Sequence, residues 1–309
     1  MVARHPCHFA LIPGQPALVR YVIGVDGGGM GTRARLESSD GEPLAAAAAG
    51  PSALGQGVAQ SWANVRQAIV EAFREAGLPP TSSSESAIGL GLSGANVALR
   101  RDTFLLAARG FAHIALDTDA YTALLGAHAG MPGAIVAAGT GSVGEALRRN
   151  GERVSVGGWG FPVGDEGSGA WLGLRAMRRA HHALDGCAPA DPLVRAVWDV
   201  AGSTRDALLA WCERAGQHAY AQLAPLVFDA ESSDPWAASL LDAGARSLEA
   251  MATALDPEGD LPLVVYGTIG QRLQQRFEPT VLARCVTPAG DAVDGAIRLI
   301  RHAMGAIAR

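Results

Sequence analysis

The chain contains no lysine, so all 25 of its lysine-plus-arginine side chains are arginines. A Walker-type phosphate loop needs a lysine after its glycines, and protein kinases need one on their third strand, so both kinds of site are excluded. A lysine Schiff base is excluded for the same reason. Any phosphate group that this protein binds must therefore be neutralised by backbone N–H groups, by arginine or by a metal ion.

Cysteine is also scarce, and its positions exclude further classes of site. No two of the four cysteines have the spacing of a metal-binding or redox pair, which favours a reduced, cytoplasmic chain. The four are Cys7, Cys187, Cys212 and Cys285.

Long apolar runs are missing as well. No uninterrupted run reaches the roughly 18 residues of a transmembrane helix, so we expect no membrane partner. Within residues 1–20 the apolar run is broken by Pro13 and Pro16, and it is too short for a secretion signal. We interpret these residues as a poorly ordered N-terminal extension.

A basic field is absent too. The formal net charge is −5 and only 18% of the residues are charged, so nothing attracts a nucleic-acid backbone and nucleic acid is not an expected partner. Small molecules are the expected ligands. A length of 309 residues with 49% hydrophobic residues indicates a globular protein, with two domains of roughly 150 residues each as the prior.

Two stretches of the chain combine a strand, a glycine-rich loop and a second strand. In the first, residues 21–25 and 34–36 flank the loop DGGGMGT, and in the second, residues 134–138 lead into GTGS. Asn150-Gly151 then marks the turn of a second hairpin across residues 146–156. This repetition favours two related domains facing each other across a cleft. The alternative is that the two glycine-rich hairpins are unrelated.

Apolar patterning predicts the other elements. Apolar residues at helical spacing from Ser61 to Ala76 indicate a helix, and Gly77 followed by two prolines indicates its end. Residues 86–92 and 113–116 read as buried strands, the first ending in Ser93-Gly94 and the second in a TDA motif. We expect a helix after this motif, a mainly helical region over 170–255, a strand at 263–266 and a final helix from 292.

Asp26 stands between the first strand and the first glycine loop, Gly27 to Gly31. Glycines let backbone N–H groups approach phosphate oxygens closely. A carboxylate at the same place would repel phosphate unless a divalent cation lay between them, so Asp26 indicates Mg²⁺ bound through water. The alternative is a tight hairpin in which Asp26 accepts local N–H groups.

Two further glycine loops are candidates for contact with a nucleotide. The second glycine loop, Gly139-Thr140-Gly141-Ser142, offers backbone donors and two hydroxyls without a carboxylate, although a plain turn would have the same sequence. The third, Gly267 to Gly270, ends a strand in Gly-x-x-Gly before a helix and can lie flat against a nucleoside.

Taken together, DGGGMGT, GTGS, GTIG and DAVDGAI in this order resemble the actin-like ATPase and sugar-kinase superfamily. The most similar branch contains the BadF/BcrA-type ATPases with the glucosamine and N-acetylglucosamine kinases. The stretches LDTDAYTALLGAHAG, GTGSVG and GGWGFPVGDEGSGAWLGLRAM are especially similar to those of the amino-sugar kinases. The resemblance covers almost the whole of residues 21–303.

The resemblance implies an α/β fold of two ribonuclease-H-like (actin-like ATPase) domains, each with a mixed five-stranded sheet. ATP and Mg²⁺ would bind in the cleft between them, and the γ-phosphoryl group would pass to the 6-hydroxyl of glucosamine or N-acetylglucosamine. The first domain would comprise residues 21–120 with the C-terminal helix 292–309, and the second residues 121–291. A homodimer is the expected assembly.

The family pattern also implies roles for individual residues. The aspartate of the TDA motif, Asp119, would be the general base, with a helix N-cap as the alternative role. Asp117 is the weaker candidate. The nucleotide would contact Gly27, Gly28, Gly29, Gly31, Thr32, Gly139, Thr140, Gly141, Ser142, Gly267 and Gly270. The sugar would contact Ser93, Gly94, Thr140, Gly157, Gly158, Trp159 and Asp165.

The sequence departs from the family pattern at one position of the expected sugar site. Related kinases often carry an asparagine after the first hairpin, where this chain has Gly50-Pro51-Ser52-Ala53, so Ala53 lacks the side chain and Ser52 is the candidate substitute. Arg33 follows the first glycine loop, where a basic residue could face phosphate, but a solvated strand charge is the favoured interpretation. The negative charges of Asp165 and Glu166 could alternatively interact with a helix N-terminus.

Two other functions fit parts of the sequence. A BadF-type activator would hydrolyse ATP and feed electrons to a dehydratase through an iron–sulfur cluster, but the four cysteines lie outside the matching loops. A sugar-responsive repressor would need a DNA-binding module, for which the residues before Tyr21 are too few. The choice between glucosamine and N-acetylglucosamine stays open.

Overall fold

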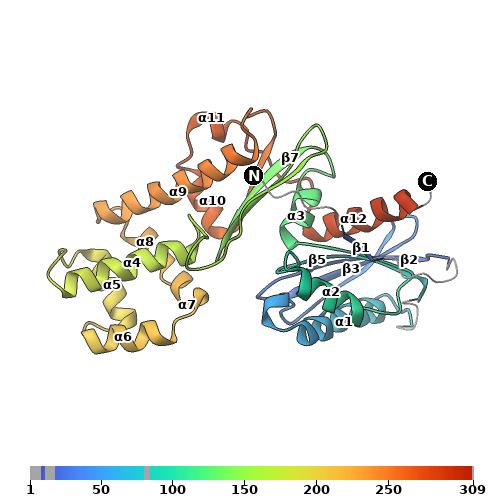
Figure 1. Cartoon of the computed structure of the whole chain (residues 1–309), viewed down its shortest axis with the longest axis horizontal. Coiled ribbons are helices and arrows are strands. Elements are labelled where there is room, and N and C mark those ends of the chain that lie inside the picture. The colour runs from blue at the N-terminus through green and yellow to red at the C-terminus, as the bar shows by residue number, and fades with distance from the viewer. Residues whose placement is uncertain (1–7, 11–17, 80–83, 308–309) are drawn as a thin grey trace. The chain divides into compact units, whose positions relative to one another are not determined.

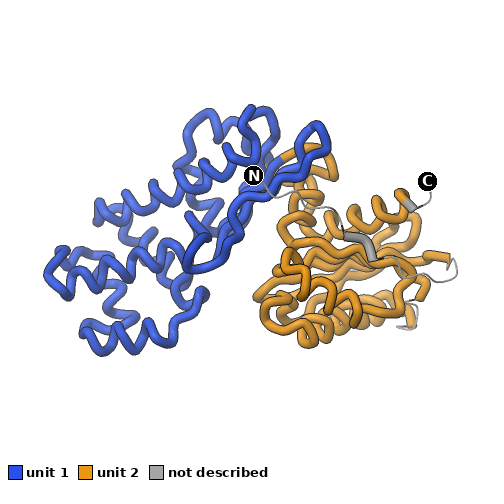
Figure 2. Tube along the Cα trace, viewed as in Figure 1, with its two compact units in different colours: residues 1–3, 134–286 blue, residues 4–133, 287–309 orange. Residues whose placement is uncertain are grey.

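The computed structural model describes residues 8–10, 18–79 and 84–307 (Figure 1). These residues form two compact units (Figure 2). Unit 1 comprises Ala134–Val286, and unit 2 comprises the described residues before Ala134 and after Val286. The first half of the chain and the C-terminal helix thus build one unit together, and the segment between them builds the other.

The boundary between the units lies after Gly133, not after residue 120 as expected. Helix α3 (Asp119–Ala127) belongs to unit 2 because it packs backbone to backbone against the start of α12 (Ala292–Ile307). A Cβ on Gly126 would lie 1.8 Å from the carbonyl oxygen of Asp291. A Cβ on Gly295 would lie 1.7 Å from the carbonyl oxygen of Thr122. Only glycine permits such an approach, and it fixes α3 to unit 2.

The sheet of unit 2 has six strands, in the order β1-β6-β5-β2-β3-β4. The strands β2, β5 and β6 are parallel, whereas β3 is antiparallel to β2 and closes the expected first hairpin. The bounds are β1 (His8–Ala10), β2 (Tyr21–Gly27), β3 (Thr32–Ser38), β4 (Pro43–Ala49), β5 (Ser86–Leu92) and β6 (His113–Asp117).

The sixth strand corrects the expectation for residues 1–20. Residues 8–10 pair antiparallel with the edge strand β6 instead of forming an irregular extension, so the sheet gains a strand over the five expected. The backbone of an edge strand offers unpaired N–H and C=O groups, and a short segment upstream can satisfy them. The rest of that expectation, residues 1–7 and 11–17, lies outside the described residues.

Helices cover both faces of this sheet (Figure 1). The first face packs against α1 (Val58–Glu75) and α2 (Ala98–Ala107), and Phe73 and Phe104 are fully buried there. The second face packs against α12, where Gly24 and Gly89 leave room for Ile297 and the Ala296 backbone. A short 3₁₀ helix, η1 (Leu54–Gln56), precedes α1.

The sheet of unit 1 has four strands, in the order β10-β7-β8-β9, one fewer than expected. Strand β10 runs parallel to β7, and β8 and β9 form the expected hairpin, with Gly151 in the left-handed region (φ 82°) at its turn. After β9 the chain turns directly into helices and supplies no fifth strand. The bounds are β7 (Gly133–Ala138), β8 (Ser142–Leu147), β9 (Arg153–Gly157) and β10 (Leu263–Tyr266).

The region 170–255 is mainly helical, as expected. The helices of unit 1, two of which follow this region, are α4 (Gly169–Leu184), α5 (Pro192–Ala201), α6 (Arg205–Arg214), α7 (Gln217–Ala221), α8 (Ala224–Ala230), α9 (Pro235–Leu255), α10 (Thr268–Gln274) and α11 (Pro279–Leu282). Helices α4, α5, α6 and α9 begin after side-chain caps, for example Ser168, whose oxygen accepts from Trp171 N–H, and Asp234 before the longest helix.

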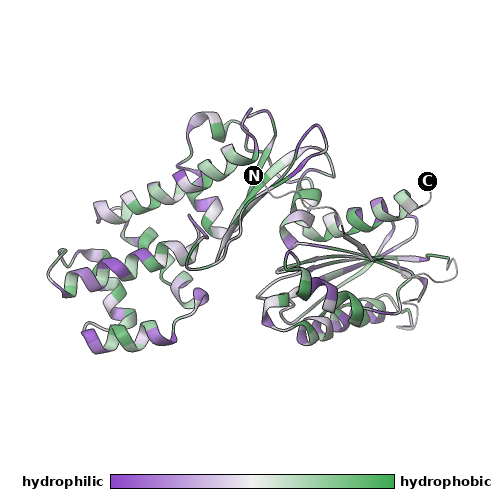
Figure 3. Cartoon of the chain, viewed as in Figure 1, coloured by the Kyte–Doolittle hydropathy of each residue, from purple (hydrophilic) through white to green (hydrophobic). Residues whose placement is uncertain are grey.

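Many helices of both units carry apolar and polar residues side by side (Figure 3). This pattern suits helices that place one face on a core and the other in water. Among the described residues, no helix combines the length and the apolar character that a membrane crossing requires.

Candidate active site

Asp26 lies at the end of β2 and is paired with an arginine. Its register partner on β3 is Arg33, whose Nη2 donates to Asp26 Oδ2 at 2.8 Å and whose Nε donates to the same oxygen at 3.3 Å. Arg33 Nη1 also donates to Asp291 Oδ2 at 3.1 Å, ahead of α12. Arg33 is thus a strand charge with 55% of its side chain exposed, as the favoured interpretation holds, and its guanidinium also joins two carboxylates.

The free oxygen of Asp26 fits a hydrated cation. Burial raises the pKa of Asp26 above its ordinary value, and the pairing with Arg33 offsets only part of this rise. The structure records no hydrogen bond from a described residue to Asp26 Oδ1. Among the described residues there is no group of three or more metal-binding side chains, so a Mg²⁺ ion at Asp26 would need water and nucleotide phosphate for its other ligands.

The first glycine loop presents backbone donors beside Asp26. Gly28 N–H donates to the Gly31 carbonyl and closes the turn, but no described residue accepts from the N–H groups of Gly29, Met30 or Gly31. A Cβ on Gly28 would meet nothing within 4 Å, and its φ is not in the left-handed region. Neither packing nor backbone conformation requires this glycine, so the open space above it suits a ligand.

Gly27 is different, since packing requires it. A Cβ there would lie 2.0 Å from Ser52 Oγ and 2.7 Å from Leu92 Cδ2. Ser52 is fully buried, and Thr32 Oγ1 lies 2.7 Å from Ser52 Oγ and 2.6 Å from the Gly50 carbonyl oxygen. The Thr32 hydroxyl and Ser52 thus hold the loop together, and Ser52 is no substitute for a sugar-binding asparagine.

Asp119 is the first residue of α3, and the N-cap role falls to its neighbour. Thr118 Oγ1 accepts from Tyr121 N–H at 3.1 Å, so the alternative role of Asp119 as the N-cap is wrong. Burial and the negative charge of Asp26 raise the pKa of Asp119 to about 6, against the smaller lowering effect of hydrogen bonds, one of them with the Ser93 side chain. Asp26, Ser93 and Asp119 therefore lie together where β2, β5 and β6 end.

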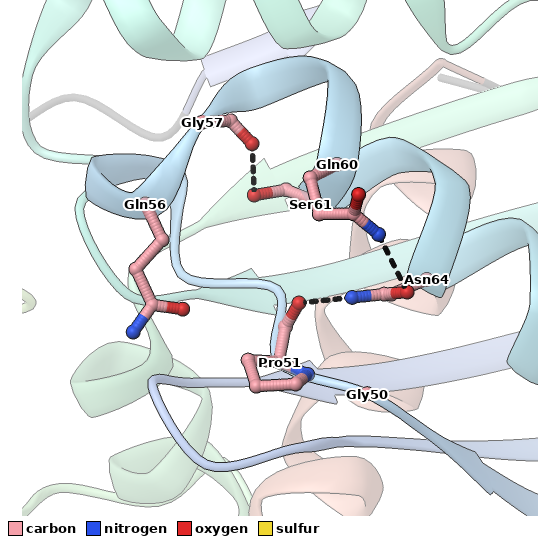
Figure 4. A pocket seen from close by; sticks show the side chains of 7 residues that line it. All are labelled: Gly50, Pro51, Gln56, Gly57, Gln60, Ser61 and Asn64. Carbon is pink, nitrogen blue, oxygen red and sulfur yellow. Dashed lines mark hydrogen bonds between the residues drawn. The ribbon is translucent and has the colours of Figure 1, made fainter.

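An amide-lined pocket of about 380 Å³ opens beside the 50–53 loop (Figure 4). Gln60 Nε2 donates to Asn64 Oδ1 at 3.1 Å, and Asn64 donates to the Pro51 carbonyl, while Gln56 lies apart from this pair. No charged side chain lines the pocket. Its lining residues are Gly50, Pro51, Gln56, Gly57, Gln60, Ser61 and Asn64.

The second glycine loop of unit 1 also presents unpaired donors. Gly139 N–H donates to the Gly141 carbonyl at 2.9 Å, and no described residue pairs with the N–H groups of Thr140 and Gly141 or with the Thr140 hydroxyl. A Cβ on Gly139 would meet nothing within 4 Å. Ser142, in contrast, is buried, and its hydroxyl donates to the Glu166 carbonyl at 2.8 Å.

The expected sugar-binding segment follows β9. Gly157 and Gly158 have φ values of 76° and 69°, and Trp159 is 82% exposed, so its ring is accessible to a ligand. Asp165 is only 4% exposed and both its oxygens are occupied, Oδ1 by Ser142 N–H at 3.1 Å and Oδ2 by Gln217 Nε2 at 2.7 Å. Gln217 was not predicted from the sequence, because it lies 52 residues downstream in a helical region without a motif.

The third glycine loop is not the flat loop expected. Helix α10 begins at Thr268, so Gly270 is a buried helical residue. A Cβ on Gly270 would lie 3.5 Å from the backbone nitrogen of Ala138. Gly267 is the N-cap residue with φ 82°, and a Cβ there would lie 2.3 Å from the Ala138 carbonyl oxygen. Packing against β7 explains both glycines, and Gly270 has no surface to offer a nucleoside.

A family model described as the BadF/BadG/BcrA/BcrD ATPase family matches residues 23–265. The chain belongs to this family. A glucosamine kinase, GspK, of Vibrio cholerae serotype O1 is 38% identical over 280 residues, which cover 90% of this chain and 95% of the relative.

Two solved structures extend the comparison. A Chromobacterium violaceum protein provisionally named an N-acetylglucosamine kinase is 50% identical, with a TM-score of 0.87 over 91% of this chain and 99% of its own. A Streptomyces griseus glucokinase of the ROK family, solved with glucose and AMPPNP, has a TM-score of 0.52 at 16% identity over 91% of this chain and 99% of its own. The latter shows the fold alone, the α/β fold with two mixed sheets found in sugar kinases.

In this member of the BadF/BadG/BcrA/BcrD family the expected site residues fall into two groups, one in each unit. Each unit brings its own group together, and the expectation that nucleotide lies in a cleft between two domains stays a prediction. The group of unit 2 is Asp26, Gly27, Gly28, Gly29, Gly31, Thr32, Ser93, Gly94 and Asp119. The group of unit 1 is Gly139, Thr140, Gly141, Ser142, Gly157, Gly158, Trp159, Asp165, Gly267 and Gly270.

Proposed function

We propose that this protein is an ATP-dependent kinase that transfers the γ-phosphoryl group to the 6-hydroxyl of glucosamine or N-acetylglucosamine. The observation that carries the proposal is the group formed by Asp26, Ser93 and Asp119 at the strand ends of unit 2, beside three unpaired backbone donors. Similarity to the Vibrio cholerae glucosamine kinase over nearly the full length supports the amino-sugar substrate.

Asp119 acts as the general base. A carboxylate with a pKa of about 6 is ionised at neutral pH and still basic enough to take a proton during attack. The 6-hydroxyl oxygen attacks the γ-phosphorus, its proton passes to Asp119, and the bond from the γ-phosphorus to the bridging oxygen breaks to release ADP. The Ser93 side chain holds the carboxylate in place through its hydrogen bond.

The chain binds phosphate without lysine. In unit 2, the unpaired N–H groups of the first glycine loop are donors for phosphate oxygens, and Asp26 would hold a hydrated Mg²⁺ through its free oxygen. In unit 1, the unpaired N–H groups of the second glycine loop and the Thr140 hydroxyl are donors of the same kind. The ion supplies neutralisation of the charge that develops on the phosphates. Arg33 already pairs with Asp26, so it limits the repulsion between that carboxylate and the nucleotide.

The residues that the family pattern assigns to the sugar are Ser93 and Gly94 in unit 2, and Thr140, Gly157, Gly158 and the exposed ring of Trp159 in unit 1. An aromatic face suits the apolar side of a pyranose ring, while the backbone of the loop donates to hydroxyls. The cytoplasm as location and a homodimer as assembly are part of the proposal, and they stand on the sequence.

The experiment is a coupled ADP-release screen across hexoses, amino sugars and N-acetylated amino sugars. Glucosamine or N-acetylglucosamine should give a kcat/KM at least about tenfold above that of glucose, because one well-placed polar contact is worth that much. Equal rates with and without sugar would contradict a kinase. They would favour an ATP-hydrolysing activator of the BadF type, which iron in the freshly purified protein would then support.

A further inference from the structure

We propose that Gln217 is a positioning residue that acts through Asp165 to set the conformation of the second glycine loop. This inference rests on the proposed function, in which that loop binds phosphate. Gln217 Nε2 donates to Asp165 Oδ2 at 2.7 Å, and Asp165 Oδ1 accepts from Ser142 N–H at 3.1 Å. One carboxylate thus connects the first residue of α7 to the last residue of the loop.

The Asp165 carboxylate is enclosed by the loop that it holds. The residue is 4% exposed and adopts a left-handed φ of 62°. A Cβ on Gly141 would lie 2.9 Å from Asp165 Oδ1, so Gly141 is glycine because the carboxylate packs against its backbone. Such a buried charge is stable only when its hydrogen bonds are made, and Gln217 makes one of them.

Helix α7 holds Gln217 in a fixed position. The Tyr220 ring lies 5.2 Å from Phe161 and 5.1 Å from Trp211, measured between centroids. Gly173 of α4 lets the Tyr220 backbone approach closely, since a Cβ there would lie 1.8 Å from the Tyr220 carbonyl oxygen. Helix α7 therefore contacts the 157–164 segment through Tyr220 and the loop through Gln217 and Asp165.

The arrangement leaves the loop's donors available. With Ser142 N–H taken by Asp165 and the Ser142 hydroxyl by the Glu166 carbonyl, the unpaired groups are the N–H of Thr140, the N–H of Gly141 and the Thr140 hydroxyl. Loss of the Gln217 contact frees the carboxylate to turn toward water, and Ser142 then loses its acceptor. The expected consequence falls chiefly on the nucleotide, for which the loop supplies these three donors, and less on the sugar, whose other proposed contacts lie outside the loop.

This role differs from the one implied by resemblance, in which Asp165 binds the sugar directly, and kinetics separates the two. Gln217→Leu should lower kcat/KM for ATP about 10- to 100-fold, the cost of leaving a charged acceptor without its donor, with the sugar KM within about twofold of wild type. Gln222→Leu is the matched control, because Gln222 is exposed at the end of the same helix and its side chain is hydrogen-bonded to His218. It should leave all constants unchanged.

A reversal of donor and acceptor tests the contact itself. Gln217→Glu places a second carboxylate against Asp165 and should lower kcat/KM for ATP at least as much as Gln217→Leu. Adding Asp165→Asn gives the new carboxylate an N–H donor and keeps an oxygen for Ser142, so the double variant should regain at least about tenfold over Gln217→Glu. A raised sugar KM in Asp165→Asn with no effect of Gln217→Leu would overturn the proposal.

Amide hydrogen exchange separates this inference from the proposed function. Without any substrate, Ser142 N–H should exchange at least about tenfold faster in Gln217→Leu than in wild type or Gln222→Leu. Unchanged exchange would refute the positioning role even in an active kinase. If exchange is faster but the protein phosphorylates no sugar, the positioning role of Gln217 is supported and only the proposed kinase function is refuted.

Discussion

At the scale of single residues, the ionised carboxylate of Asp119 lowers the stability of the folded protein. Its folded-state pKa of about 6 lies above its ordinary value of 3.8, so folding favours the protonated form. Its contribution to stability is therefore full below pH 4, declines as the pH rises through 6, and stays low above that. The carboxylate that we propose as the base thus lowers the stability of the folded protein at neutral pH.

Asp119→Asn should accordingly stabilise the protein at neutral pH. We expect a gain of about 1–2 kcal/mol in the free energy of unfolding at pH 8, less than the full shift implies because solvent partly reaches the carboxylate. The difference from wild type should shrink steadily between pH 7 and pH 4. Denaturant unfolding at several pH values measures it, and a variant less stable than wild type at pH 8 would contradict the assignment.

Asp26 should influence the titration of Asp119. Its negative charge is among the causes that raise the pKa of Asp119, so Asp26→Asn should lower that pKa below 6. A carbon-detected NMR titration of the Asp119 carboxyl, assigned with Asp119→Asn, measures the shift in protein without nucleotide. Asp102→Asn, at an exposed carboxylate on α2, is the control and should leave the titration unchanged. An identical midpoint in Asp26→Asn would mean that the two carboxylates do not interact.

At the scale of elements, two adjacent glycines separate packing from ligand binding. Gly27→Ala should destabilise the protein by about 1–3 kcal/mol, since its Cβ collides with Ser52 and Leu92. Gly28→Ala should fold with wild-type stability because its Cβ meets nothing, yet raise the KM for ATP at least about tenfold by filling the phosphate's space. Melting temperatures and ATP kinetics of both variants test this. Wild-type ATP kinetics in Gly28→Ala would place the phosphates elsewhere.

The elements themselves were largely readable from the sequence, because their signals are local. Strands β5 and β10 have the predicted bounds, and the Asn150-Gly151 turn joins β8 to β9. Gly270 was misread because the sequence Gly-x-x-Gly does not reveal that the helix begins after the first glycine. Only the packing against β7 shows why the second glycine is there.

Side-chain partners distant in sequence were not readable. Arg33 bonds Asp291 across a separation of 258 residues, and Gln217 bonds Asp165 across 52. No periodicity or spacing encodes such pairs, since they depend on how the chain folds back. The candidate acids were found from their motifs, whereas the groups that hold them required the structure.

At the scale of the whole molecule, the chain leaves unit 2 at β7 and returns to it at α12. The sequence predicted this return, but it did not predict that α3 stays in unit 2. Helix α3 is held there by the close approach of Gly126 to Asp291, two residues that are far apart in the sequence. The predicted number of strands was also wrong, because the two sheets have six and four strands and not five each. Short edge strands such as β1 carry too little pattern to be recognised.

The central claim concerns the whole enzyme, and a comparison of two variants tests it most directly. Phosphorylation of glucosamine and N-acetylglucosamine by Asp119→Asn and by the control Asp102→Asn should be measured together with ATP affinity. We predict that Asp119→Asn loses about 10²- to 10⁴-fold in kcat with ATP affinity nearly unchanged, and that Asp102→Asn behaves as wild type. Phosphorylation at the wild-type rate by Asp119→Asn would contradict the account.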